Sequence, residues 1–165
     1  MKRLILVSAI FGLVAGCSGG YSFTGGSVGE AKTIAVDYFP NKAQLVNPNL
    51  SIQITEAIKD IFVQQTPLEL VDNNADMFVE GSIVTYEVRP ISAQGNETTS
   101  QSRFTIGISV TFTNNLEPDK SFTQRFSRYR DFSSENLFAD VENALVSEIN
   151  QELAEDVLNR AIANW

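Results

Sequence analysis

The sequence predicts an α+β fold, a two-layer sandwich in which two helices pack on one face of a four-stranded mixed sheet. Two observations carry this prediction. Two long segments repeat their apolar residues at helical spacing, and four other segments alternate apolar with polar residues, as half-buried strands do. The resulting element order is β-α-β-β-β-α. Because one strand face is apolar and the other is rich in Thr, Ser and Gly, both helices should cover the same side and leave the other for solvent or a partner.

The first strand and the first helix are predicted from the N-terminal third. Residues 33–39 alternate apolar and polar side chains, which predicts a strand. Asn47 and Pro48 predict a helix start, with asparagine as N-cap and proline at the first helical position. The helix should end near residue 65. Its apolar residues recur at helical spacing: Leu50, Ile54, Ala57, Ile58, Ile61 and Phe62.

The second strand is predicted over residues 77–88. Before it, residues 68–71 form a short extended piece that leads into an Asx-rich turn. The apolar positions of the strand change parity along its length, which predicts a bulge or sharp twist near Gly81 and Ser82. Residues 90–102 are polar and are expected to form a hairpin loop.

The third strand, residues 104–113, shows the most regular alternation in the chain, and residues 121–131 should form the fourth. Ser133 or Ser134 is expected to cap the last helix, with Glu135 in its first turn. The predicted buried stripe of this helix is Phe138, Val141, Leu145, Ile149, Leu153 and Val157.

The N-terminus has the layout of an export signal. Lys2 and Arg3 precede an apolar run over residues 4–15, which is shorter than the roughly 20 residues that cross a bilayer. The run ends in Leu-Val-Ala-Gly-Cys, a match to the bacterial lipobox. We therefore expect residues 1–16 to be a lipoprotein signal peptide and Cys17 to become the acylated first residue.

The anchor region also bears on location. In families where sorting is understood, aspartate after the lipidated cysteine retains a lipoprotein at the inner membrane, whereas Ser18 stands here. By resemblance to that rule, we expect the outer membrane. Residues 17–31 should be a glycine-rich tether, and residues 32–165 a single domain. Two or three acyl chains would hold such a protein durably.

Composition excludes several function classes. Loss of Lys2 and Arg3 with the signal peptide takes the formal charge from −8 to −10, which disfavours nucleic-acid binding. The single cysteine is used for lipid, so neither a thiol nucleophile nor a cysteine metal site remains. The chain has no histidine, which removes the commonest general base and metal ligand. We expect a binding or assembly protein, not an enzyme, without cofactors.

One segment imitates a metal site. Asp72-x-Asn74-x-Asp76 begins like a calcium loop, but Met77 stands where the loop needs glycine and Ile83 where it needs glutamate. We interpret the segment as an Asx-rich turn and predict no metal site.

Several short motifs, in order and spacing, resemble the lipopolysaccharide-assembly lipoprotein family (LptE-like) over nearly the whole mature chain. They follow the acylated cysteine in this order: Gly20-Tyr21-Ser22-Phe23, Lys32-Thr33-Ile34-Ala35-Val36, Phe39-x-Asn41, Pro48-x-Leu50, Thr55-Glu56-Ala57-Ile58, and Ala75 to Ile83 running on to Tyr86. The resemblance implies a lipoprotein on the periplasmic side of the outer membrane. It also implies a partner, an LptD-type β-barrel protein that the lipoprotein plugs and helps to fold, and binding of lipopolysaccharide on its way to the outer leaflet.

Four arginines are the candidate lipopolysaccharide contacts. Arg128 and Arg130 should share one strand face about 7 Å apart, with Arg125 opposite and Arg103 on a side set by register. Guanidinium groups can hold phosphate in bidentate fashion. The alternative is that these arginines pair with Asp131, Glu135 or solvent as ordinary strand-end charges.

A second function from another class also has support. Residues 33–36 with Phe39-x-Asn41, followed by a helix, resemble curli-type secretion-channel lipoproteins. Such a channel subunit or pilot lipoprotein would oligomerise, whereas a barrel plug should be a monomer with one dedicated partner.

Overall fold

The computed structural model describes residues 27–45, 47–91 and 100–162. The signal peptide predicted over residues 1–16, acylation at Cys17, most of the tether and the centre of the expected hairpin loop lie outside these residues.

The sheet is mixed, as predicted, but it has five strands instead of four. Their order is β2-β1-β3-β4-β5. Strand β1 runs parallel to β2 and β3, and the remaining neighbours are antiparallel. The strands are β1 (Thr33–Val36), β2 (Glu69–Leu70), β3 (Met77–Ile91), β4 (Gln101–Asn114) and β5 (Phe122–Ser133).

The additional strand is the short extended piece that precedes the Asx-rich turn. Glu69 and Leu70 of β2 pair with Thr33 and Ile34 of β1. Two residues are too few for an alternating pattern, and the pairing joins segments separated by a whole helix. The sequence therefore predicted the extended backbone but not its place in the sheet.

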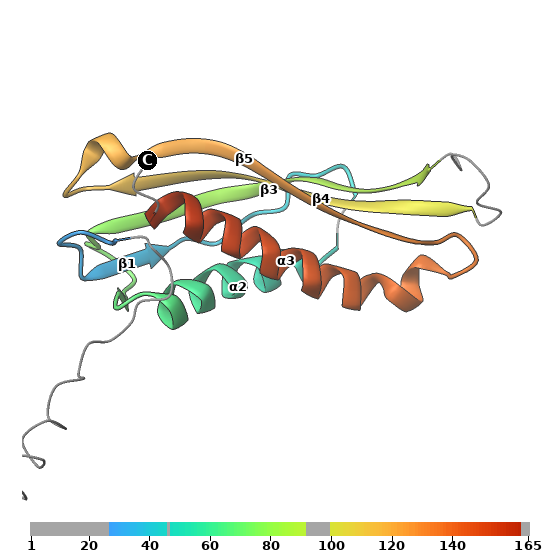
Figure 1. Cartoon of the computed structure of the whole chain (residues 1–165), viewed down its shortest axis with the longest axis horizontal. Coiled ribbons are helices and arrows are strands. Elements are labelled where there is room, and N and C mark those ends of the chain that lie inside the picture. The colour runs from blue at the N-terminus through green and yellow to red at the C-terminus, as the bar shows by residue number, and fades with distance from the viewer. Residues whose placement is uncertain (1–26, 46, 92–99, 163–165) are drawn as a thin grey trace, which may run out of the picture.

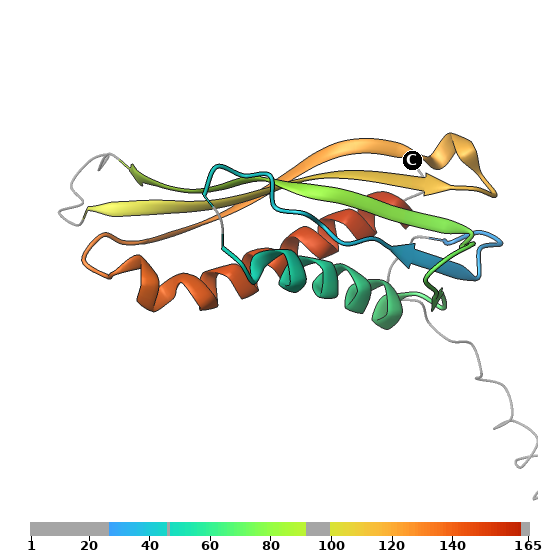
Figure 2. The same cartoon turned by 180° about the vertical axis from the view of Figure 1, so that it is seen from behind.

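Both helices cover the same face of the sheet, which confirms the predicted two-layer sandwich (Figures 1 and 2). They are α2 (Leu50–Gln65) and α3 (Phe138–Ile162), and they run side by side in the same general direction. A single 3-10 turn, η1 (Pro118–Lys120), links β4 to β5. Among the described residues, no helix is both long and apolar enough to span a membrane.

Both helices start later than predicted. The N-cap of α2 is Asn49, because the side chain of Asn47 is used in a turn and accepts from the Asn49 N–H at 2.9 Å. Similarly, the Ser133 hydroxyl accepts from the Glu135 N–H at 3.3 Å in a turn that precedes α3. Each polar residue thus caps a local turn, an alternative to helix capping that such side chains commonly adopt.

The core lies between the inner sheet face and the two helices. The five apolar side chains of β4 are fully buried, as their alternation predicted: Phe104, Ile106, Ile108, Val110 and Phe112. The helices meet them with Ile54, Ile58, Ile149, Leu153 and Val157, all with no exposed surface. Burial of each such side chain contributes about 1.5–3 kcal/mol, so this layer dominates the stability of the domain.

The parity change in β3 is a β-bulge, as expected, but it lies at Val84. The register against β4 shifts between Ile83 and Thr85, two positions beyond the Gly81-Ser82 pair. Glycine is required at position 81 for a reason unrelated to the bulge, which is the close approach of two neighbouring groups. A Cβ at this position would lie 2.5 Å from the ring of Phe39 and 2.4 Å from the Ser109 carbonyl oxygen.

The segment after β1 brings Phe39 to this position. The Asp37 N–H donates to the Val79 carbonyl at 2.9 Å, and the Ile83 N–H donates to the Pro40 carbonyl at 3.0 Å. The segment therefore continues along β3 and places the buried Phe39 ring against Gly81.

The other face of the sheet carries neither helix (Figures 1 and 2). In β4 this face is formed by Thr105, Gly107, Ser109, Thr111 and Thr113, all but the glycine partly exposed. The predicted division into an apolar, helix-covered face and a hydroxyl-rich, uncovered face is confirmed.

Candidate functional site

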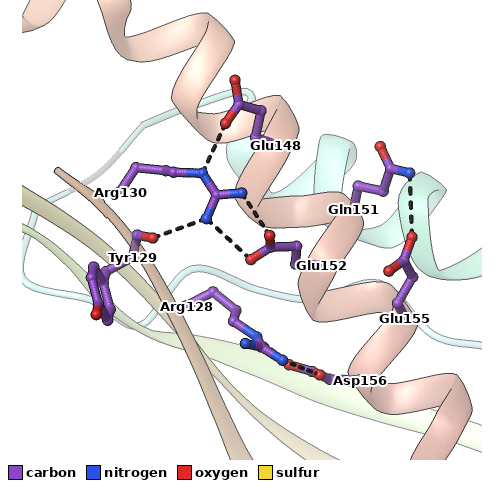
Figure 3. Close-up of polar contacts among 8 residues, drawn as sticks. All are labelled: Arg128, Tyr129, Arg130, Glu148, Gln151, Glu152, Glu155 and Asp156. Atoms are coloured by element: carbon purple, nitrogen blue, oxygen red, sulfur yellow. Dashed lines mark hydrogen bonds and ion pairs between the residues drawn. The ribbon is translucent and has the colours of Figure 1, made fainter. Parts of the chain in front are cut away.

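The edge strand β5 carries three of the four candidate arginines. Phe126 is buried under α3, and because strand residues alternate between faces, Arg128 and Arg130 project on the same side (Figure 3). Arg128 reaches across to Asp156 of α3. Its Nε donates to Oδ2 at 2.6 Å and its Nη2 to Oδ1 at 2.5 Å, which is a bidentate ion pair.

Arg130 joins the strand to two carboxylates of the same helix (Figure 3). Its Nε donates to Glu148 at 2.8 Å, and its Nη2 and Nη1 donate to Glu152 at 2.6 Å and 3.2 Å. The Nη1 also donates to the Tyr129 carbonyl at 3.1 Å. Hydrogen bonds from Arg130 hold the pKa of the Glu152 carboxyl below its ordinary value.

The same contacts raise the pKa values of the two arginines. Hydrogen bonds to Glu152 and then to Glu148 raise the pKa of Arg130, and the Asp156 carboxylate raises that of Arg128. The side chains stay partly exposed, so each pair contributes at most about 1 kcal/mol. A hollow of about 430 Å³ lies along the strand here and is lined by residues 127–131 and Glu152.

Arg103 and Arg125 lie on the uncovered face. The register places Arg103 opposite Asp131, and its Nε and Nη2 donate to that carboxylate at 2.7 Å and 2.9 Å. The guanidinium also stacks over the ring of Tyr129, 3.7 Å from its centroid. Hydrogen bonds from Arg103 lower the pKa of Asp131. Within the described part of the chain, Arg125 has no carboxylate within ion-pair distance, and Glu135 pairs with none of the four arginines.

The structure therefore divides the four arginines into two pairs on opposite faces. The alternation of β5 predicted the separation of Arg125 from Arg128 and Arg130, and the register now assigns Arg103 to the side of Arg125. Sequence reasoning missed the partners on α3. Glu148, Glu152 and Asp156 are spaced by four, so they share one helix face, and this was the signal that could have revealed them.

A second polar cluster, also missed, joins β3 to the start of α3. The Tyr86 hydroxyl donates to Oε1 of Glu142, and the Asn47 amide donates to the same oxygen at 2.7 Å. Burial and the Glu142 carboxylate together raise the pKa of Tyr86. A tyrosine in an apolar strand face needs a partner for its hydroxyl, but the sequence offered no means of choosing Glu142.

The calcium-like segment does form a turn. Asn74 adopts a left-handed conformation with φ 54°. The Asp76 carboxylate accepts from the N–H groups of Lys32 and Thr33 at 2.8 Å and 3.1 Å, and from the Thr33 hydroxyl at 3.0 Å. These bonds lower the pKa of Asp76, and they fix the start of β1. No group of three or more potential metal ligands occurs among the described residues.

Comparison with protein families gives one match. The family model described as LptE, lipopolysaccharide-assembly, matches residues 31–161, which is almost all of the described fold. Comparison with curated protein sequences gives no significant match.

Several solved structures have a similar fold. The rare lipoprotein B from Shewanella oneidensis is 11% identical, with a TM-score of 0.53 over 76% of this chain and 91% of that one. A minor lipoprotein from Acinetobacter baumannii is 11% identical, with a TM-score of 0.52 over 79% of this chain and 93% of that one. The PelC dodecamer from Paraburkholderia phytofirmans is 12% identical, with a TM-score of 0.52 over 85% of this chain and 96% of that one. At these identities the likeness concerns the fold alone.

Proposed function

The chain belongs to the LptE lipopolysaccharide-assembly family, and from this premise we propose that it is a non-enzymatic accessory lipoprotein of the lipopolysaccharide translocon. In this proposal, acyl chains on Cys17 hold the protein at the periplasmic face of the outer membrane. Its partner is an LptD-type β-barrel protein, which it plugs and helps to assemble, and it takes part in lipopolysaccharide transport to the outer leaflet. The observation that carries the proposal is the family match over residues 31–161.

The uncovered sheet face is the surface that we assign to the barrel. A barrel lumen is polar, so a plug should present hydrogen-bonding side chains instead of an apolar patch. The partly exposed hydroxyls of Thr105, Ser109, Thr111 and Thr113 meet this requirement.

Depletion of the protein tests the partnership. Cells that lack it should contain less correctly folded barrel protein and should become permeable to large hydrophobic antibiotics. Immunoblots of the barrel protein and antibiotic sensitivity measure the two effects. A normal barrel level together with an unchanged permeability barrier would contradict the proposal.

Arg128 and Arg130 are the residues that we assign to lipopolysaccharide phosphates, with Arg125 and Arg103 as further candidates on the opposite face. Because Glu148, Glu152 and Asp156 already occupy the two guanidinium groups, a phosphate would have to exchange with these carboxylates. Phosphate offers the same bidentate geometry with more charge, so the exchange is chemically reasonable.

The double variant Arg128→Gln/Arg130→Gln tests this assignment. Glutamine avoids the repulsion that a glutamate would meet from the three carboxylates on α3. Binding of labelled lipopolysaccharide should weaken by roughly 1.5–3 kcal/mol per lost charged hydrogen bond, and its salt dependence should fall. The matched control is Lys59→Gln/Lys120→Gln, which removes the same amount of charge at two positions outside the four candidate arginines. Unchanged binding by a double variant with a normal thermal melt would show that the pair serves only to connect β5 with α3.

One observation supports the curli-type secretion-channel or pilot function as the alternative. The PelC structure, which has a similar fold, is a dodecamer. A channel subunit should form a ring in native mass measurements of the protein extracted from outer membranes, whereas a barrel plug should be found in a complex with one barrel chain.

A further inference from the structure

A groove of about 470 Å³ lies between α2 and α3 on the outer surface of the helix layer. Its floor is apolar and contains Ala57, Ile61 and Ala154. Its walls are polar: Glu56 and Asp60 contribute carboxylates, and the remaining lining side chains are amides and one serine hydroxyl. The groove lies on a different side of α3 from the carboxylates that bind Arg128 and Arg130.

Asn150 in the wall of this groove has an unpartnered acceptor. The residue is only 3% exposed, and no donor among the described residues reaches its Oδ1. Buried polar atoms in native proteins are almost always hydrogen-bonded, since an acceptor that has lost water is costly without a replacement donor. Because Oδ1 itself is buried, a bound group can satisfy this acceptor once the Asn150 amide rotates toward the groove.

The charge around the groove is negative. Its acidic side chains are Glu56 and Asp60 of α2, since no carboxylate of α3 lines the groove and three of them pair with Arg128 and Arg130. Lys59 lies 2.9 Å from Glu56 and offsets that charge in part, whereas Asp60 forms no ion pair among the described residues. The lining itself includes no cationic side chain. A positively charged group should therefore be attracted to the groove.

We propose that this groove binds a lysine- or arginine-bearing segment of a partner protein. The cationic side chain lies beside Glu56 and Asp60, its methylene stem covers the apolar floor, and it donates to Oδ1 of Asn150 after that amide rotates toward the groove. Ammonium and guanidinium groups are donors only, which matches a lining dominated by oxygen acceptors. The inference does not depend on lipopolysaccharide binding, so it stands or fails separately from the proposed function.

The test uses the mature, lipidated protein in detergent, with fluorescent octalysine as the probe and an octaserine peptide as the uncharged reference. The double variant Glu56→Gln/Asp60→Asn should weaken octalysine binding by about tenfold or more, since close opposite charges contribute strongly to such contacts. Asn150→Leu should weaken it as well, because it removes the acceptor at similar volume. The control is Glu30→Gln/Asp119→Asn, which makes the same change in net charge at two exposed positions outside the groove.

Three results would overturn the proposal. The first is an equal loss of binding in the control variant, which would reduce the effect to overall charge. The second is undiminished binding by a folded Asn150→Leu variant. The third applies if that variant does not fold, and it is measured on the wild-type protein. Octalysine should shift the side-chain amide signal of Asn150 in the ¹H–¹⁵N spectrum, and an unmoved signal would overturn the proposal.

Discussion

Thr55 shows how a single hydroxyl can connect two elements. Its side chain accepts from the Phe39 N–H at 3.1 Å and donates to the Ser51 carbonyl at 2.7 Å, and the residue is 3% exposed. The first bond satisfies a buried backbone donor in the segment after β1. The second orients the hydroxyl from within α2. The position of the Phe39 ring in the core therefore depends on this contact.

Thr55→Val should destabilise the domain by about 1–3 kcal/mol, because the shape is nearly kept while the buried Phe39 N–H loses its acceptor. Thr55→Ser keeps the hydroxyl and should cost clearly less. Denaturant unfolding of the two variants beside the wild type measures the difference. Equal losses in the two variants would show that the threonine methyl, and not the hydrogen bond, matters at this position.

Sequence reasoning at the scale of single residues reached the pattern but not the partners. Alternation along β5 predicted which arginines share a face, because a strand's side-chain period is fixed by its backbone. The alternation could not predict that Arg128 pairs with Asp156 or Arg130 with Glu152, since those ion pairs depend on how α3 packs over the sheet edge. The unpaired Oδ1 of Asn150 was equally inaccessible, because it follows from burial between two helices.

At the scale of elements, prediction succeeded where a pattern was long. The alternation of β4 and the apolar stripe of α2 were read correctly, because each extends over many residues. In α3 the predicted stripe is buried from Ile149 onward, whereas Phe138, Val141 and Leu145 are only partly buried. Prediction failed for β2, whose two residues carry no period. The prediction also placed both helix starts too early, because Asn47 and Ser133 could cap either a turn or a helix.

The β5–α3 connection should make stability depend on pH. Arg130 lowers the folded-state pKa of Glu152 below its ordinary value of 4.5. The stabilisation is therefore complete above that pH and is lost as the pH falls through the folded-state pKa. In Glu152→Gln, the decline in melting temperature from about pH 5 to about pH 3 should be smaller than in the wild type.

Glu155→Gln is the control for this prediction. Glu155 lies on the same helix and accepts from Gln151 at 3.3 Å, but it forms no ion pair among the described residues. Its variant should keep the wild-type slope of melting temperature against pH. If Glu152→Gln showed the same slope as the wild type, the connection to Arg130 would not contribute to acid sensitivity.

At the scale of the whole molecule, the lipid anchor proposed at Cys17 would determine where the domain can act. Cys17→Ala should abolish acylation and leave unprocessed precursor, because the lipoprotein signal peptidase acts on the lipidated cysteine. Metabolic labelling with a fatty acid and the apparent mass on a gel measure the two effects. Cleavage before residue 17 and membrane sorting in this variant would contradict the lipoprotein assignment.

The meeting of the two ends of the domain determines how it would move on such an anchor. The Ser27 N–H donates to the Ile162 carbonyl at 3.1 Å, so the chain enters and leaves the domain at one pole. The paired ends of β3 and β4, Ile91 and Gln101, lie at the opposite pole (Figure 1). Strand β3 has 15 residues and therefore spans about 50 Å. Acylation at Cys17, as proposed, would attach the domain by its Ser27 end and leave the β3–β4 end as the part of the described fold farthest from the anchor.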